Sequence, residues 1–257
     1  MRGMSDGSRE TCDSSESGSA TPPIAYPRFA SAYNWLMARS VIQLGLDPLR
    51  RAVVGQASGL VLEVGAGGGQ NFPFYDPAQV TRVVAAEPDA TMLAVARRHI
   101  ALAPVPITLT RAAVEALPFS DATFDSVVSA FVWCSVADPA QGLREVWRVL
   151  KPGGRLSLLE HVRASGALVA GLQDALVPLT TRFMGNDHWN RDTVQNVRNA
   201  GFAISQLQQV SGGLSPLLRL VALRSAAPAS ENAPGGPASE DAPPEHRVTF
   251  SCVVAHP

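Results

Sequence analysis

Residues 63–70 combine a carboxylate with four glycines in a segment that could cradle a charged ligand. The segment reads Glu-Val-Gly-Ala-Gly-Gly-Gly-Gln and continues the apolar run Leu60–Val64. Glycine has no Cβ, so a turn built from it is tight and lets a ligand approach the backbone closely. A helix that begins after such a turn offers unpaired N–H groups. In a doubly wound α/β sheet, this is where a nucleotide-like ligand binds.

Two kinds of nucleotide cofactor suit this segment, and the spacing of its residues separates them. The dinucleotide fingerprint G-x-G-x-x-G fits Gly65 and Gly67 but meets Gln70 at its last glycine. The pattern E-x-G-x-G-x-G matches completely from Glu63 to Gly69. The carboxylate of Glu63 disfavours a pyrophosphate and suits the amine and sulfonium of S-adenosylmethionine (SAM). SAM is therefore favoured over NAD, and a purely structural turn is the remaining alternative.

Glu87 is the second residue that could bind such a cofactor. It ends the next apolar run, about twenty residues beyond the glycines, where a carboxylate can accept both hydroxyls of a ribose.

Alternating strands and helices are predicted to position these residues. Strands are expected at Leu60–Val64, Arg82–Glu87, Ile107–Arg111, Phe124–Phe131 and Arg155–His161, with a final pair over residues 202–210 and 215–224 joined by the Gly212-Gly213 turn. Helices are expected at about Phe29–Leu44, after the glycine turn, after Asp89, after Asp138 and over residues 190–201. Asp89 and Asp138 are typical N-caps. Continuously apolar strands are typical of parallel strands covered on both faces. The pattern predicts a Rossmann-like, doubly wound α/β sheet of seven strands, mostly parallel with the last strand antiparallel.

Four motifs in this order resemble the class I SAM-dependent methyltransferases. They are VLEVGAGGG, VVAAEPDATML, VEALPFSDATFDSVVSAF and EVWRVLKPGGRLSLLEH, and the resemblance covers residues 24–225. Within the class, VWCSVADP, EHV and HWNRDT are most similar to the thiol-methyltransferase-like branch. The segment FASAYNWLM is similar to the cap helix which that branch shares with quinone C-methyltransferases and phospholipid N-methyltransferases.

The resemblance implies a role for each matching residue of the cofactor site. Glu63, Gly65, Ala66 and Gly67 would hold the methionyl end of SAM, and Glu87 would bind the ribose diol. Pro88, Ala113 and Val114 would lie beside the adenine, although many members have Asp where this chain has Ala113. Ala130 and Phe131 would face the methionine moiety, and Tyr33 on the cap helix would close over it.

Three residues are candidates for chemistry on the methyl acceptor. His161 follows the fifth strand and could be a general base, since its unperturbed pKa lies near 6.5; a structural, hydrogen-bonded histidine is the alternative. Asp187 and His188 lie in a loop that could cover the site. The cap helix, the loop after Phe131 and the loop around residues 187–191 are expected to form an apolar, aromatic acceptor pocket.

Composition narrows the range of partners. The net charge is −1 and no basic block occurs, which disfavours nucleic acid and anionic membranes. Three widely spaced cysteines without CxxC pairs predict no metal site and no disulfide framework, and they suit the reducing cytoplasm. No signal peptide or membrane-spanning run is seen, so a cytoplasmic monomer or homodimer without a membrane anchor is expected. Residues 1–23 and 226–246 are polar or Pro/Ala-rich and are expected to be disordered, and residues 247–257 are read as a short strand or a disordered tail.

The sequence thus predicts a methyltransferase that moves a methyl group by SN2 transfer from SAM to a small-molecule acceptor, leaving S-adenosylhomocysteine. A thiol or other soft nucleophile is the first expectation. A quinone carbon, a phenol or a phospholipid amine is the alternative, and a non-catalytic SAM-binding regulator is the second.

Overall fold

A computed structural model describes residues 41–184, 188, 190–211 and 215–225. Within these ranges a seven-stranded sheet has the strand order β3-β2-β1-β4-β5-β7-β6. The strands are β1 (Gly59–Val64), β2 (Val80–Ala86), β3 (Ile107–Thr110), β4 (Phe124–Ala130), β5 (Leu150–His161), β6 (Phe202–Gln209) and β7 (Leu217–Arg224). The first five strands pair in parallel, whereas β7 is antiparallel to both β5 and β6. This confirms the predicted fold class, the final strand pair included.

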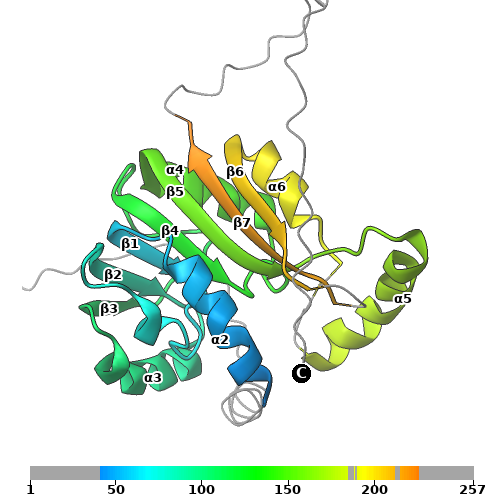
Figure 1. The fold of residues 1–257 in the computed structure, drawn as a ribbon, viewed down its shortest axis with the longest axis horizontal. Helices are drawn as coiled ribbons and strands as arrows, with labels where there is room; N and C mark the ends of the chain where they lie inside the picture. Colours follow the sequence, from blue (N-terminus) through cyan, green and yellow to red (C-terminus); the bar gives the residue numbers. More distant parts are fainter. Residues whose placement is uncertain (1–40, 185–187, 189, 212–214, 226–257) are drawn as a thin grey trace, which may run out of the picture.

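Helices cover both faces of the sheet (Figure 1). They are α2 (Val41–Val54), α3 (Ala90–His99), α4 (Pro139–Val149), α5 (Ala167–Met184) and α6 (Thr193–Asn199). One face, here called the α2–α3 face, packs Val54 and Ala96 against Val61 of β1. The other, the α4–α6 face, packs Leu143 and Val197 around the next residue of β1, Leu62. Successive strand residues thus point to opposite layers, as the period of a strand requires.

Two predicted N-caps start helices as expected. The side chain of Asp89 accepts the N–H groups of Thr91 and Met92 at the start of α3. Asp138 accepts the N–H of Gln141 at the start of α4 and is followed by Pro139 in the first turn. These caps fix where each helix leaves the sheet edge.

Two helix predictions were wrong or incomplete, and one helix was not predicted. The segment after the glycines forms no α-helix; a single 3-10 turn, η1 (Phe72–Phe74), occupies it, because Pro73 and Pro77 cannot donate the backbone hydrogen bonds that a helix needs. The helix expected to end at Leu44 continues to Val54. The sequence pattern did not single out α5, which extends away from the sheet at the right of Figure 1.

Several predictions lie outside the described residues. They concern the leader 1–23, residues 24–40 with Tyr33, the Gly212-Gly213 turn, and the segments 226–246 and 247–257. Among the described helices, none is long and apolar enough to cross a bilayer.

Candidate active site

The carboxyl ends of the parallel strands bring most of the predicted cofactor residues to one edge of the sheet. The glycine turn follows β1, Glu87 follows β2, and Phe131 follows β4. Strand β1 lies between β2 and β4, so the strand order reverses beside it. In open α/β sheets, ligands bind in the crevice at such a reversal.

The turn after β1 depends on glycine for both its backbone angles and its packing. Gly65, Gly67 and Gly69 have φ angles of +61°, +56° and +82°, which residues other than glycine rarely adopt. A Cβ on Gly65 would lie 2.4 Å from a methyl carbon of Val132. Glycine at position 65 therefore allows the chain after β4 to approach the chain after β1.

Glu87 is fixed against this turn by two backbone hydrogen bonds. The N–H of Gly67 donates to its Oε2 at 2.9 Å, and the N–H of Asp89 donates to its Oε1 at 3.0 Å. The side chain is 8% exposed, and burial raises the pKa of the carboxyl above its ordinary value. The sheet edge thus presents an oriented carboxylate beside the backbone of the glycine turn, where the ribose-binding residue was predicted.

Glu63 lies in a buried hydrogen-bond network. Its Oε2 accepts a hydrogen bond from the hydroxyl of Tyr75 at 2.8 Å, and its Oε1 accepts one from the amide nitrogen of Asn71 at 3.0 Å. The amide oxygen of Asn71 in turn accepts a hydrogen bond from Nη1 of Arg50 at 2.9 Å. Burial raises the pKa of Glu63 to about 7, while both hydrogen bonds and the charge of Arg50 lower it by less. The side chain predicted to hold the methionyl end is therefore anchored from β1, η1 and α2.

Phe131 stands at the end of β4 in a strained conformation. Its φ is +61°, which is unusual for a bulky residue. The Phe131 ring lies 5.2 Å from the ring of His161, and the guanidinium carbon of Arg50 lies 5.2 Å from its centroid. Backbone strain of this kind is often retained at functional sites. Phe131 thereby connects the glycine-turn network to the end of β5, and Ala130 precedes it, half-buried.

His161 is held in place at the end of β5. Its Nδ1 lies 2.7 Å from the hydroxyl of Ser215, just before β7. The ring is half-buried against Phe131 on the α2–α3 face. The hydrogen bond fixes the orientation of the imidazole, which is compatible with either a structural histidine or a positioned base.

The loop containing His188 packs on the loop that follows β4. The N–H of His188 donates to the carbonyl of Cys134 at 2.9 Å. The guanidinium of Arg191 donates to the carbonyls of Trp133 and Val136, both at 2.6 Å. The two loops expected to flank the acceptor therefore lie together, whereas Asp187 falls outside the described residues.

The residues predicted to lie beside the adenine are of mixed burial. Val114 is buried, and Ala113 is half-buried with its carbonyl accepting a hydrogen bond from the N–H of Ala116. Ala66, which was predicted to lie at the methionyl end instead, is also buried. The carbonyl of Pro88 accepts a hydrogen bond from Nε of Arg111 at 3.2 Å.

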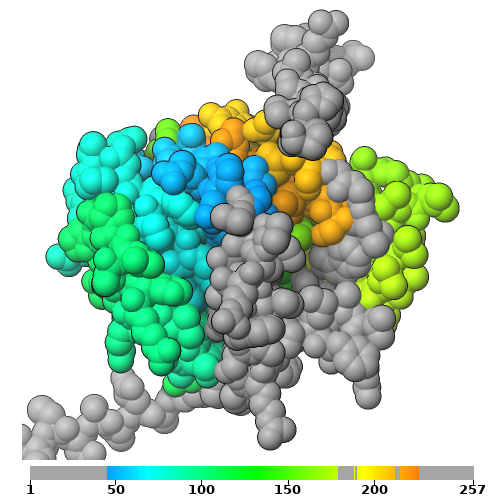
Figure 2. Space-filling model, turned by 60° about the horizontal axis from the view of Figure 1, so that its bottom comes forward, coloured from blue at the N-terminus to red at the C-terminus, as the bar shows by residue number. Residues whose placement is uncertain are grey.

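Three residues of the network were missed by sequence reasoning. Asn71 and Tyr75 follow the glycines at no recognisable spacing, and Arg50 lies in a helix far from them in the chain. Only the packing of α2 against η1 brings Arg50 to Asn71, so no local pattern could have found it. Figure 2 shows α2 in blue beside the cyan segment that follows β1.

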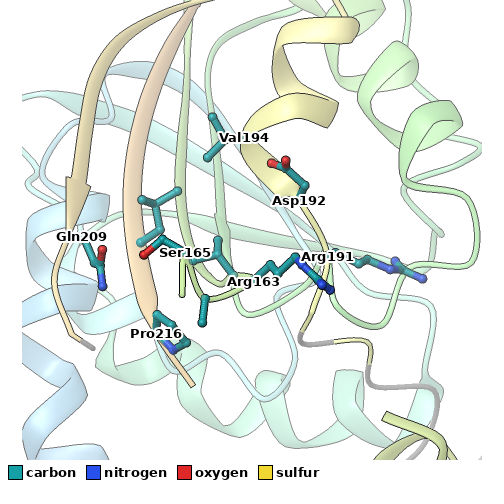
Figure 3. Close-up of a pocket in the computed structure, with 10 residues that line it drawn as sticks. Arg163, Ser165, Arg191, Asp192, Val194, Gln209 and Pro216 are labelled. Carbon is teal, nitrogen blue, oxygen red and sulfur yellow. The ribbon is translucent and has the colours of Figure 1, made fainter. Parts of the chain in front are cut away.

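A pocket of about 290 Å³ opens beyond the end of β5 (Figure 3). Its lining includes Val162, Val194 and Leu218, which belong to the α4–α6 face. Phe131 belongs to the opposite face. The pocket is therefore separate from the Phe131–His161 contact. Among the described residues, no group of three metal-binding side chains occurs.

Comparison with known proteins identifies the family. Residues 62–158 match the family described as a methyltransferase domain. A demethylmenaquinone methyltransferase of Clavibacter sepedonicus is 30% identical over 228 residues, which cover 79% of this chain and 91% of that protein. The chain belongs to the class I SAM-dependent methyltransferases. This methyltransferase is also similar to a thiol S-methyltransferase, TMT1B, of Rattus norvegicus, with 32% identity over 153 residues. That match covers 58% of this chain and 62% of the relative, so it spans about three fifths of the relative's length.

Solved structures support the same fold. A SAM-dependent methyltransferase of Thermotoga maritima superposes with a TM-score of 0.58 at 20% identity, covering 77% of this chain and 97% of that chain. At this identity the likeness concerns the fold alone, because one fold hosts many activities.

Proposed function

We propose that this methyltransferase binds SAM at the edge formed by Gly67, Glu87 and Glu63 and methylates a small soft nucleophile, in the first place a thiol. The observation that carries the cofactor site is the pair of hydrogen bonds that fix the Glu87 carboxylate against the backbone of Gly67 and Asp89. When bound, SAM supplies an electrophilic methyl group for direct displacement by the acceptor.

The chemistry of the site fits the parts of SAM. Glu87 offers lone pairs to a ribose diol beside a turn in which Gly67 carries no side chain. Glu63 supplies negative character for an ammonium and a sulfonium. The buried side chain of Val114 suits an uncharged adenine. These residues would bind, orient and partly desolvate the cofactor.

Acceptor chemistry is proposed at the Phe131–His161 contact. The imidazole is held by Ser215 and packs on the ring of Phe131, the residue proposed to face the methionine moiety. Alignment of two reactants can supply roughly 7–11 kcal/mol of the barrier. A general base adds a factor of about 10² to 10⁴. A thiol, with an ordinary pKa near 8.5, needs little help from a base, so His161 would position or deprotonate the acceptor in a supporting role.

Two relatives support different acceptors. The similarity to a thiol S-methyltransferase agrees with the thiol proposal. The match to a demethylmenaquinone methyltransferase covers 91% of that relative and favours a quinone carbon as the second candidate. His188, whose N–H donates to the carbonyl of Cys134, is proposed to flank whichever acceptor binds, and Asp187 is proposed to act with it.

Labelled SAM offered with a panel of acceptors tests this proposal. The panel comprises an alkyl thiol, a catechol, a reduced demethylated quinone and a phosphatidylethanolamine dispersion. Product on the thiol supports the first candidate, and product on the quinone alone supports the second. Binding of SAM without turnover on any acceptor would favour a non-catalytic regulator, and binding of NAD in place of SAM would overturn the cofactor assignment.

A matched pair of variants ties turnover to the proposed site. Glu87→Gln keeps the shape but replaces one accepting oxygen by a donor, so we expect SAM affinity to fall at least about tenfold. Asp76→Asn makes the same change at a carboxylate that also accepts a backbone N–H, that of Ala78. Equal affinity loss in both variants would contradict a specific role for Glu87.

A further inference from the structure

Arg50, on α2, contacts both the segment that follows β1 and the residue that follows β4, at the sheet edge proposed to bind SAM. Its Nη1 donates to the amide oxygen of Asn71 at 2.9 Å, in the segment after β1. Its guanidinium carbon lies 5.2 Å from the ring centroid of Phe131, at the end of β4. The side chain is half-buried, and the contacts with Asn71 and Phe131 help to hold the guanidinium in place.

The charged side chains at this edge include both signs. Glu63 and Glu87 are carboxylates, and Arg50 is a cation whose charge acts on Glu63. Asn71 bridges the two signs, since its amide donates to Glu63 and its carbonyl accepts from Arg50. A ligand that carries an ammonium and a carboxylate on one carbon matches this arrangement, whereas a carboxylate beside the two glutamates alone would be repelled.

We propose that Arg50 binds the carboxylate at the amino-acid end of SAM and thereby selects cofactors that carry an intact amino acid. This inference rests on the proposed function, because it assumes that SAM occupies the edge. A guanidinium is suited to the role, since its planar N–H groups match the two oxygens of a carboxylate. Its orientation by Asn71 and Phe131 also reduces the entropy lost on binding.

The same contacts predict which neighbour should have no such role. Arg51, the next residue of α2, lies with its guanidinium carbon 4.9 Å from the ring centroid of Phe74, in η1. Arg51 is exposed, and its guanidinium packs on the ring of Phe74 in η1 rather than on the ring of Phe131. Arg51 thus shares the residue type, the helix and an aromatic partner with Arg50 but not its place at the edge.

The test is a binding series on the full chain by calorimetry. The ligands are S-adenosylhomocysteine, decarboxylated SAM, which keeps the amine but lacks the carboxylate, and 5′-methylthioadenosine, which lacks both. The proteins are the unmodified chain, Arg50→Met, Arg50→Lys and Arg51→Met. We expect Arg50→Met to weaken S-adenosylhomocysteine at least about tenfold, the usual range for a hydrogen bond to a charged group. Binding of the other two ligands should change by less than about twofold.

The variants separate the outcomes. Arg50→Lys should recover part of the affinity for S-adenosylhomocysteine, because it keeps the charge without the planar fork, and Arg51→Met should leave all three ligands unchanged. Equal weakening of all three ligands by Arg50→Met would show a merely structural role and overturn the inference, as would no change at all. Failure of the unmodified chain to bind S-adenosylhomocysteine would instead overturn the proposed function, and the inference with it.

Discussion

Glu63 places an ionisable group in the core beside the glycine turn, so its protonation should affect stability. Its pKa rises from an ordinary 4.5 to about 7, chiefly through burial. The folded chain therefore holds a proton that the unfolded chain releases above pH 4.5. The stabilisation is fully present below pH 4.5 and is lost as the pH rises through 7, for a total of about 3 kcal/mol.

Glu63→Gln should remove this pH dependence. Urea unfolding of both proteins from pH 4.5 to 8 is expected to show the unmodified chain losing stability relative to the variant as the pH rises. Glu145→Gln serves as a control, because hydrogen bonds from Arg148 lower the pKa of Glu145, so its contribution to stability is not lost as the pH rises. A stability difference between the unmodified chain and Glu63→Gln that stays constant with pH would contradict the assignment.

Gly65 should tolerate no side chain, for two separable reasons. Alanine there would adopt a φ of +61° and would place its Cβ 2.4 Å from Val132. Gly153 also has a positive φ, +75°, but a Cβ there would meet nothing within 4 Å. We expect denaturation to show Gly153→Ala losing about 1–2 kcal/mol from backbone strain alone and Gly65→Ala losing about 2–5 kcal/mol. Equal losses would show that the contact with Val132 relaxes freely.

At the scale of elements, the start of α3 matters for both stability and binding. Asp89 caps the helix with its side chain, while its backbone N–H bonds to Glu87. Asp138 makes the same kind of cap on α4, where its side chain accepts the hydrogen bond of the Gln141 N–H in the first turn. Alanine at either position should cost about 1 kcal/mol in urea unfolding.

Binding separates these two caps. Asp89→Ala should also weaken S-adenosylhomocysteine, because fraying of the first turn of α3 releases the Asp89 N–H that orients Glu87. Asp138→Ala should not. Calorimetry on both variants checks this expectation, and unchanged affinity in Asp89→Ala would mean that Glu87 keeps its position without the cap.

At the scale of the whole molecule, ligand binding at the sheet edge should stabilise the fold by mass action. At a concentration one hundred times its Kd, S-adenosylhomocysteine is expected to add about 2.7 kcal/mol. For a domain of this size, that raises Tm by about 5–10 °C. Differential scanning calorimetry with and without the ligand measures the shift, with NAD at equal concentration as the comparison. An NAD shift larger than that of S-adenosylhomocysteine would contradict the cofactor proposal.

Features that follow from local chemistry could be predicted from the amino-acid sequence. The alternation of apolar runs and capped helices predicted the seven-stranded sheet, because strand burial and N-capping each depend on a few neighbouring residues. The four sequence motifs predicted the methyltransferase family. Glu87 could be located in the same way, since it ends a strand whose neighbour carries the glycine turn.

Features that depend on contacts between distant segments are set by how the layers pack. Arg50, Asn71 and Tyr75 come together around Glu63 only when α2 packs on η1. The contact of Phe131 with His161 likewise requires β4 and β5 to lie side by side. The expected helix after the glycines does not form for a local reason, the two prolines at 73 and 77. Periodicity reports which face of an element is buried, but the partner that each side chain meets is set by how the layers pack.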